Sequence, residues 1–383
     1  MFKYYALTLS FLLFSVFCSG QNPKAEKELQ AVIDDLDVVG LSVVVVNKGD
    51  VVYKHQFGMQ DVEKNIPLSD RTLFRIASIS KSFSAVTIMQ LIEAGKLSLD
   101  DDASKLVGFA VRNPKFPDKV ITLKMLMSHT SSVNDSQGYF YLDLIDPAKN
   151  PNWAKCYNDY APGTKWQYCN LNFNMIGAII ERQTGERFDQ RIKHRILDPL
   201  GLYGGYCVDS LDASRFATLY EYDSLNKRFT PMPQAYAPRT EEIRNYTMGY
   251  STPVFSPTGG MKITAEDLAK YMTMHMYNGL YKGVKIMSGK SAEQLREKIS
   301  EDEGYGMAIR TATELIPGKV LKGHTGSAYG LYSAMFFDPQ DKFGFVVITN
   351  GCIPDEQSDI RNVLSRSIVI LYNNIIKSNL RKE

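Results

Sequence analysis

The chain has 383 residues and a formal net charge of +2, with 44% hydrophobic and 22% charged residues. This length suffices for one large domain or two ordinary ones, and the composition is typical of a globular protein with a sizeable core. Because the charge is nearly balanced, we expect neither a nucleic-acid partner nor binding to an acidic membrane surface.

The first residues have the pattern of a secretory signal peptide. After Lys3, residues 6–17 form an uncharged apolar run that ends in small residues. We therefore predict that residues 1–20 are a signal peptide and that the mature protein is exported, either periplasmic or secreted. The run is too short for a stable membrane span, although an uncleaved anchor is an alternative. A lipoprotein acylated at Cys18 is the weaker alternative, because Phe17 is bulkier than such sites accept.

Four cysteines remain once Cys18 is set aside, and none of them has CxxC spacing. The absence of this spacing argues against metal or thioredoxin-like chemistry. No metal ligands and no cofactor are predicted. In an exported protein the four could pair in three ways, and free buried thiols are equally compatible with the sequence. The four are Cys156, Cys169, Cys207 and Cys352.

The N-terminal part contains a helix, a hairpin and a second, longer helix. Residues 24–35 have amphipathic spacing, and the β-branched runs at 43–46 and 51–57 flank a tight turn. Residues 58–70 are predicted as a loop. The pattern from Ser78 to about Ala94 is helical and ends at a glycine. Apolar residues surround most of this helix axis, so we expect the helix to be buried between two layers.

The middle of the chain contains helical patches, and its end returns to strands. The clearest helices are predicted at 121–128 and 171–184, and Thr264 is a plausible N-cap of another. Short β runs follow at 319–323, 332–338 and 343–349, and a closing helix is predicted at about 359–377. We predict an α/β (α+β) fold in which an antiparallel sheet flanked by helices is built from both chain ends, with an all-helical insertion.

The first chemical signal is the pair Ser78 and Lys81. Residues at i and i+3 share a helix face, so the lysine amine lies within reach of the serine hydroxyl. Burial and the positive end of the helix dipole lower a lysine pKa, which lets the amine accept a proton. Ser-x-x-Lys alone is a weak pattern that chance supplies.

The second signal is Tyr168 and Asn170, separated by one residue. A tyrosine can relay a proton to a leaving group, and an asparagine can bind both a lysine and a substrate amide. The structural alternative is a loop tyrosine followed by an N-cap asparagine. The spacing recurs at Tyr372 and Asn374, which shows that it arises easily.

The third signal is the run His324-Thr325-Gly326-Ser327 at a predicted strand edge or turn. Glycine there permits a ligand to approach the backbone closely. The backbone N–H of Ser327 could join that of Ser78 as an oxyanion hole. His324 could be a cation, a proton donor or simply a polar edge residue.

In this order the three signals match serine β-lactamases and penicillin-binding proteins. The sequence resembles the class C β-lactamase group, which also contains D-alanyl-D-alanine carboxypeptidases, D-aminopeptidases and esterases. The resemblance extends from about Val39 to Asn350. It is carried by six blocks: 74–81, 121–131, 160–170, 197–201, 259–267 and 323–326.

The resemblance implies a role for each matching residue. Ser78 would attack a carbonyl and form an acyl-enzyme, with Lys81 and Tyr168 sharing the general-base role. Tyr168 would then protonate the leaving group, and Asn170 would hold Lys81 and the substrate amide. Residues 324–327 would bind substrate. The resemblance also implies one catalytic domain at 21–383, with an α/β part at about 25–105 and 265–383 and a helical insertion at about 106–264.

His324 departs from the family pattern, which has a lysine at this position. A histidine is mostly neutral near pH 7, so we expect weaker recognition of a carboxylate and inefficient β-lactam hydrolysis. The expected substrate is a small molecule or peptide, with a cell-wall origin as one option: a D-amino acid peptide, a carboxylic ester or a β-lactam. The sequence does not choose among them.

Other functions fit less well. The chain has neither Gly-x-Ser-x-Gly nor His-Glu-x-x-His, which disfavours α/β-hydrolases and zincins. His129 could belong to a catalytic triad, but a buried structural histidine is the stronger interpretation. The alternative from a different class is a penicillin-binding receptor or sensor that is acylated without efficient turnover.

Overall fold

The computed structural model describes residues 22–301, 303–354 and 361–380. The predicted signal peptide and Cys18 lie outside this range. The helices are α1 (Pro23–Asp35), α2 (Ser80–Glu93), α3 (Ala103–Val107), α4 (Leu123–Met127), α5 (Asn170–Thr184), α6 (Phe188–Ile192), α7 (Asp198–Leu200), α8 (Thr240–Arg244), α9 (Ala265–Met276), α10 (Gly289–Arg296), α11 (Asn362–Leu371) and α12 (Lys377–Leu380).

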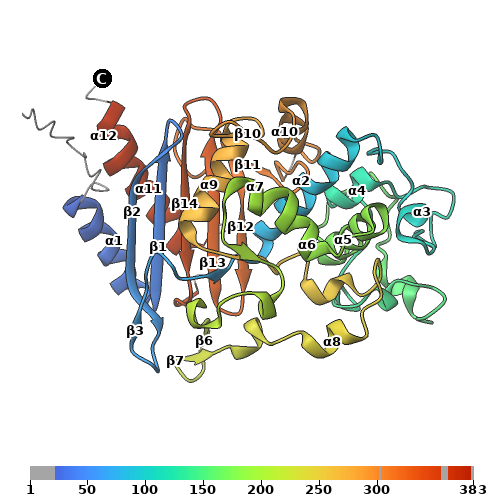
Figure 1. The fold of residues 1–383 in the computed structure, drawn as a ribbon, viewed down its shortest axis with the longest axis horizontal. Helices are drawn as coiled ribbons and strands as arrows, with labels where there is room; N and C mark the ends of the chain where they lie inside the picture. Colours follow the sequence, from blue (N-terminus) through green and yellow to red (C-terminus); the bar gives the residue numbers. More distant parts are fainter. Residues whose placement is uncertain (1–21, 302, 355–360, 381–383) are drawn as a thin grey trace, which may run out of the picture.

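The main sheet joins the two ends of the described chain, as predicted (Figure 1). Its order is β11 (Arg310–Ala312), β12 (Leu321–Ala328), β13 (Leu331–Asp338), β14 (Phe343–Thr349), β1 (Gly40–Asn47), β2 (Asp50–Asp61) and β3 (Ile66–Pro67). The pairing of β1 with β14 is antiparallel and runs from Leu41 opposite Thr349 to Asn47 opposite Phe343. The sequence therefore predicted the fold class correctly.

Alternating side chains of β1 serve two separate cores. Val43 and Val45 pack into the core shared with α1 and α11, while Val44 and Val46 pack into the core on the opposite face. This two-residue alternation is the ordinary consequence of a pleated strand. Because both faces are covered by apolar layers, the strand is a continuous valine run. Figure 1 shows α1, α11 and α12 on one side of the sheet and α9 on the other.

The predicted buried helix is α2. All of its residues from Ser80 to Met89 are buried. The Tyr271 ring of α9 stacks on Phe83 with ring centroids 3.8 Å apart, and its hydroxyl lies 3.1 Å from the Ser82 hydroxyl. A helix packed against neighbours on all sides has no polar face to show, and this explains its apolar pattern.

Several predicted boundaries were wrong in detail. Strand β2 continues to Asp61 and pairs with β3, so part of the predicted loop at 58–70 is sheet. Strand β12 starts at Leu321 and ends at Ala328, and the third chemical signal therefore lies inside a strand. The N-cap prediction is confirmed, because the Thr264 hydroxyl accepts the Asp267 N–H at 3.1 Å.

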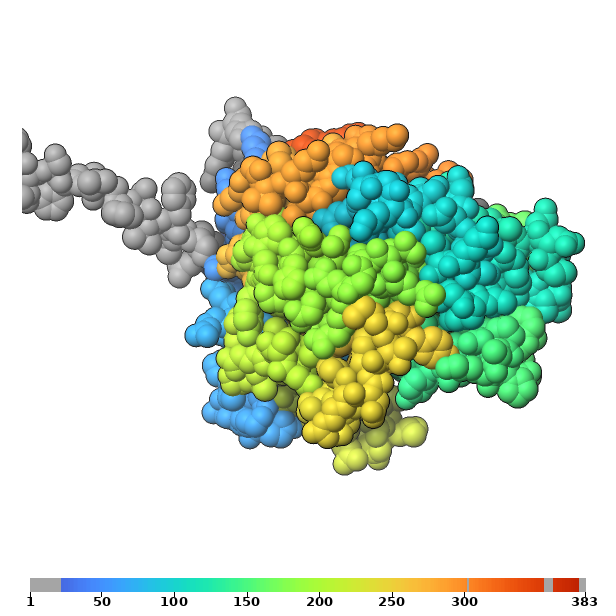
Figure 2. Space-filling view, turned by 45° about the vertical axis from the view of Figure 1, so that its right-hand side comes forward, coloured from blue at the N-terminus to red at the C-terminus, as the bar shows by residue number. Residues whose placement is uncertain are grey.

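The middle of the chain also contains short strands, so the prediction of an all-helical insertion was wrong in this respect. One small sheet is formed by β4 (Phe74–Arg75), β8 (Lys262–Ile263) and β5 (Gly204–Gly205), and another by β6 (Tyr220–Asp223) and β7 (Arg228–Pro231). A third pairs β9 (Leu280–Tyr281) with β10 (Val284–Lys285). In Figure 2 the cyan and green middle segments pack directly against the orange segment, which includes α10. The predicted insertion limits of about 106 and 264 stay a prediction.

The four cysteines of the described chain are buried free thiols, so of the two alternatives the structure shows the unpaired one. Among the residues described, no helix is both long enough and apolar enough to cross a bilayer.

Candidate active site

The structure holds Ser78 in a tight turn beside strand β12. Ser78 lies in a 3₁₀ turn (Ala77–Ile79) that leads into α2, and Ala77 has a φ of +45°. This conformation is strained for a residue with a Cβ, and such strain concentrates at functional sites. A Cβ on Gly326 would lie 2.3 Å from the Ile76 carbonyl oxygen, so only glycine lets β12 approach this turn.

Lys81 is fully buried behind Ser78 and contacts three groups. Its Nζ lies 2.9 Å from the Asn170 Oδ1, 2.9 Å from the Thr258 carbonyl oxygen and 3.2 Å from the Ser78 Oγ. The Thr258 carbonyl only accepts hydrogen bonds, and the Asn170 oxygen does the same. A neutral amine therefore donates its two N–H groups to these acceptors, and its lone pair can accept the Ser78 hydroxyl proton.

Burial lowers the pKa of Lys81 to about 7, and the negative charge of Asp135 works in the opposite direction. A substantial fraction of the amine is then neutral near neutral pH. This is the protonation state that can take a proton from Ser78.

Asp135 determines which way the Asn170 amide points. Its Oδ2 accepts hydrogen bonds from the Asn170 backbone N–H at 2.7 Å and from the Asn170 Nδ2 at 3.0 Å. Its Oδ1 accepts the Leu171 N–H at 3.0 Å, so this carboxylate also caps the N-terminus of α5. With its nitrogen held by Asp135, the amide turns its oxygen to Lys81 and to the Thr258 hydroxyl at 2.7 Å.

Tyr168 lies over the same lysine. Its ring centroid is 4.7 Å from Lys81 Nζ, and its hydroxyl is buried without a hydrogen-bond partner in the described part of the chain. Burial raises the pKa of Tyr168, although the Ser78 hydroxyl acts in the opposite direction. The phenol is therefore protonated at neutral pH, and it can pass on a proton more easily than it can act as a base.

His324 is a buried neutral residue on β12. Its Nδ1 faces the Thr325 carbonyl, which only accepts, so Nδ1 carries the proton. Its Nε2 must then accept the hydrogen bond of the Tyr305 hydroxyl at 3.0 Å. Burial lowers the pKa of His324 to about 3, with the charge of Lys81 as a smaller cause. His324 is thus not a cation at neutral pH.

His129 has a structural environment. Its Nδ1 accepts the backbone N–H of Cys169 at 3.1 Å, and its ring packs against Tyr168 with centroids 4.3 Å apart. Burial lowers its pKa well below the ordinary value. His129 supports the loop that carries Tyr168, and this fits the structural interpretation better than a triad role.

A cleft of about 640 Å³ opens above these groups. All predicted site residues line it except Lys81, which is buried behind Ser78. The wall also contains aromatic side chains and two arginines: Tyr139, Phe140, Trp166, Tyr305, Tyr329, Arg75 and Arg310.

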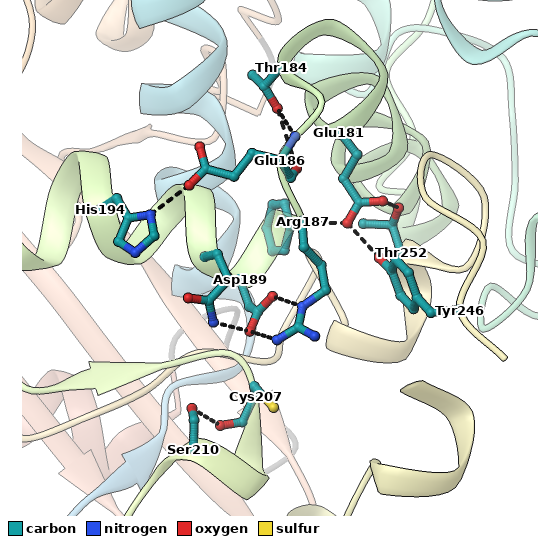
Figure 3. Close-up of polar contacts among 12 residues, drawn as sticks. Glu181, Thr184, Glu186, Arg187, Asp189, His194, Cys207, Ser210, Tyr246 and Thr252 are labelled. Carbon is teal, nitrogen blue, oxygen red and sulfur yellow. Dashed lines mark hydrogen bonds and ion pairs between the residues drawn. The ribbon is translucent and has the colours of Figure 1, made fainter. Parts of the chain in front are cut away.

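A buried carboxylate supports the cleft from behind. Glu181 accepts hydrogen bonds from the Tyr246 and Thr252 hydroxyls (Figure 3). It also accepts the Gly249 N–H. These contacts fix the loop that leads to Thr258. Gly177 of α5 lets this loop pack closely, because a Cβ there would lie 2.3 Å from the Pro257 Cγ.

Sequence reasoning missed Asp135, Thr258 and Tyr305. Asp135 follows the block at 121–131 and Thr258 directly precedes the block at 259–267, so position beside the recognised blocks was the available signal. Tyr305 lies in a segment without a motif, and only the tertiary contact with His324 shows its importance. Within the residues described, no group of His, Cys, Asp and Glu side chains could hold a metal ion.

The chain is similar to known proteins over most of its length. The profile of the Beta-lactamase family matches residues 25–368. The chain is 25% identical over 329 residues to Protein flp of Staphylococcus aureus (strain N315), covering 82% of this chain and only 60% of that protein. It is also 25% identical over 350 residues to Penicillin-binding protein 4 of Amycolatopsis lactamdurans, covering 85% of this chain and 84% of that protein.

A solved structure shows the same fold. The octameric penicillin-binding protein homologue from Pyrococcus abyssi superimposes with a TM-score of 0.72 at 25% identity, covering 92% of this chain and 77% of that one. The profile match extends over most of the sequence, including every residue of the site described above. The chain therefore belongs to the Beta-lactamase family of serine hydrolases.

Proposed function

We propose that this protein hydrolyses an amide or ester through an acyl-enzyme on Ser78. The observation that carries the proposal is the environment of Lys81, whose two neighbouring carbonyl oxygens leave its lone pair for Ser78 Oγ. Lys81 is the general base, since Tyr168 is held in its neutral form. The same proposal includes the roles of Tyr168 and Ser327.

Acylation begins when the Ser78 hydroxyl loses its proton to the neutral amine of Lys81 and attacks the substrate carbonyl. The new oxyanion is stabilised by the backbone N–H groups of Ser78 and Ser327. As the bond to the leaving group breaks, Tyr168 gives that group a proton and is reprotonated from Lys81. The products of this step are a Ser78 ester, a neutral leaving group and a neutral lysine.

Deacylation uses the same groups with water as the nucleophile. Water loses a proton through Tyr168 to Lys81 and attacks the ester carbonyl. When the bond to Ser78 Oγ breaks, that oxygen recovers a proton, and the acid product leaves. The cycle consumes one water molecule and needs no further reactant.

The substrate classes are a D-amino acid peptide, a carboxylic ester and a β-lactam. Neutral His324 supplies no positive charge to the leaving-group end of the cleft, where Tyr168 and Tyr305 surround it. This favours an uncharged leaving group over the carboxylate of a β-lactam. We also propose that residues 1–20 direct export, on their sequence pattern alone.

The test is a substrate panel with the wild type and Ser78→Ala side by side. The panel contains short-chain para-nitrophenyl esters, D-alanine-terminated peptides and a penicillin, and intact-protein mass spectrometry follows the adducts. We expect turnover of an ester or peptide with a transient adduct that Ser78→Ala abolishes. A penicillin adduct that persists would instead support a receptor. If no reagent acylates Ser78, and Ser78→Ala changes no activity, the proposal is wrong.

A further inference from the structure

Arg75 forms part of the wall of the cleft, three residues before Ser78. It lies on β4 and its side chain is 91% buried, since the residue keeps only 9% of its exposure. The residue opposite it on β8 is Lys262, whose Nζ is also buried and donates to the Tyr206 carbonyl. Two basic side chains therefore face the interior on neighbouring strands.

Few polar groups offset the positive charge of the Arg75 guanidinium. Nη1 donates to the Ala235 carbonyl at 3.1 Å, and Nη2 reaches the Ser256 hydroxyl only at 3.4 Å. Nε has no hydrogen-bond partner, and no carboxylate of the described residues forms an ion pair with this side chain. A buried cation without a counter-ion is costly, and a ligand of opposite charge that binds here would offset this cost.

The same protein shows how an arginine of this kind is satisfied. In Arg187 the edge formed by Nε and Nη2 holds both oxygens of Asp189, at 2.6 and 2.9 Å (Figure 3). This two-point contact is the preferred geometry between guanidinium and carboxylate. In Arg75 it is the corresponding edge that lacks a firm partner.

The other arginine of the cleft differs. Arg310 is paired with Glu314 at 3.0 Å, so its charge is already balanced. Arg296, which is equally buried, lies outside the cleft lining and binds the His275 carbonyl at 3.0 Å and the Asn278 Oδ1 at 2.6 Å. Arg75 is thus distinguished by three features together: burial, lack of an acidic partner and a place in the cleft wall.

The position of Arg75 indicates which part of the substrate it meets. Tyr168, which serves the leaving group, clusters with Tyr305 and His324 at ring-centroid distances of 6.4 and 6.3 Å. Arg75 instead lies 5.4 Å from the ring centroid of Tyr329, at the turn after β12. Arg75 is therefore placed by a different aromatic side chain of the cleft wall from those that surround Tyr168.

We propose that Arg75 binds a carboxylate carried by the acyl portion of the substrate. The proposal rests on the acyl-enzyme mechanism above and adds the substrate class: acyl groups that end in an anion. The carboxylate engages Nη2 in place of the Ser256 hydroxyl. Nε itself is buried, so Nη2 is the atom of this edge that meets the carboxylate.

The test compares two esters that differ only in the end of the acyl chain. Mono-para-nitrophenyl adipate carries a carboxylate where para-nitrophenyl hexanoate carries a methyl group. For wild type we expect kcat/KM to be about tenfold or more higher for the adipate, mostly through KM, as a charge-assisted contact implies. Arg75→Met should remove this preference, and Arg75→Lys should keep only part of it.

Arg310→Met is the matched control, because it removes the other cleft arginine and should leave the ratio of the two substrates unchanged. If circular dichroism shows that Arg75→Met does not fold, the adipate-to-hexanoate ratio of kcat/KM in the wild type and in Arg75→Lys tests the proposal. Equal kcat/KM for the two esters in wild type overturns the carboxylate site and leaves the Ser78 mechanism intact. If neither ester acylates Ser78 by mass spectrometry, the mechanism itself fails, and the carboxylate site fails with it.

Discussion

The carboxylate of Asp135 holds Asn170 at both its backbone N–H and its side-chain Nδ2, at 2.7 and 3.0 Å. This contact decides that the oxygen of the Asn170 amide faces Lys81. The same carboxylate raises the pKa of Lys81 against the larger effect of burial. Asp135 is therefore a positioning residue that acts on the base through geometry and through charge.

Asp135→Asn should lower kcat/KM by about 10- to 100-fold, because an amide nitrogen would face the Asn170 N–H groups and displace them. It should also move the pH at which activity rises to a lower value, because the negative charge that raises the Lys81 pKa is gone. A pH profile of kcat/KM measures both effects. Asp159→Asn, an exposed surface change, is the control. A reduced plateau with an unmoved pH limb would show that Asp135 acts on the site through geometry and not through its charge.

The pH dependence of acylation should follow Lys81. Burial lowers the pKa of Lys81 to about 7, so kcat/KM should rise through pH 7 as the amine loses its proton. His324 has a pKa of about 3 and should add no limb between pH 5 and 9. Initial rates across this range with one ester give the profile. If the rise in kcat/KM near pH 7 is unchanged in Lys81→Met, the titrating group is not Lys81.

Lys81→Met tests the base directly. The substitution removes the lone pair that faces Ser78 but fills a similar volume, so kcat/KM should fall by about 10²- to 10⁴-fold. The melting temperature should stay the same or rise, because a buried ionisable group is replaced by an apolar one. Steady-state kinetics measure the fall in kcat/KM, and thermal unfolding measures the melting temperature. Activity within tenfold of wild type would exclude Lys81 as the general base.

Buried neutral histidines should make the fold sensitive to acid. Burial lowers the pKa of both His324 and His275 from 6.5 to about 3. The unfolded chain therefore binds more protons than the folded one between these values, and stability falls as the pH drops from 6.5 towards 3. Each histidine contributes a slope of about 1.4 kcal/mol per pH unit in this window. Urea unfolding at several pH values measures the slope.

His275→Leu is the informative variant for this slope. Both ring nitrogens of His275 lack hydrogen-bond partners among the described residues, so an apolar side chain should be tolerated. The variant should have a shallower dependence on pH and unchanged ester turnover. An identical slope would show that other groups control acid unfolding.

Gly326→Ala should impair the site by moving β12 away from the nucleophile turn. The new Cβ would lie 2.3 Å from the Ile76 carbonyl oxygen and 3.0 Å from the Ala77 Cβ. We expect a loss of about 100-fold in kcat/KM and a destabilisation of about 1–3 kcal/mol. Gly289→Ala is the matched control, because its Cβ would meet only Asn278 at 3.8 Å. Turnover by Gly326→Ala at the wild-type rate would refute this account of the turn.

The strands and helices followed from local patterns. The valine run of β1, the glycine after α2 and the Thr264 cap each depend on neighbours a few residues away, so they could be predicted from the sequence. The small sheets of the middle region could not. Strands β4, β5 and β8 have two residues each, and their pairing depends on segments that are distant along the chain.

The sequence by itself identified the serine, the lysine, the tyrosine and the histidine of the site, because the order and spacing of these residues match a family pattern. The tertiary structure decided their states. Lys81 has a pKa of about 7 because its surroundings bury it completely. Asn170 turns its oxygen towards Lys81 because Asp135, from a distant part of the sequence, holds its nitrogen. Protonation and orientation depend on the complete surroundings of a group, which a linear sequence does not show.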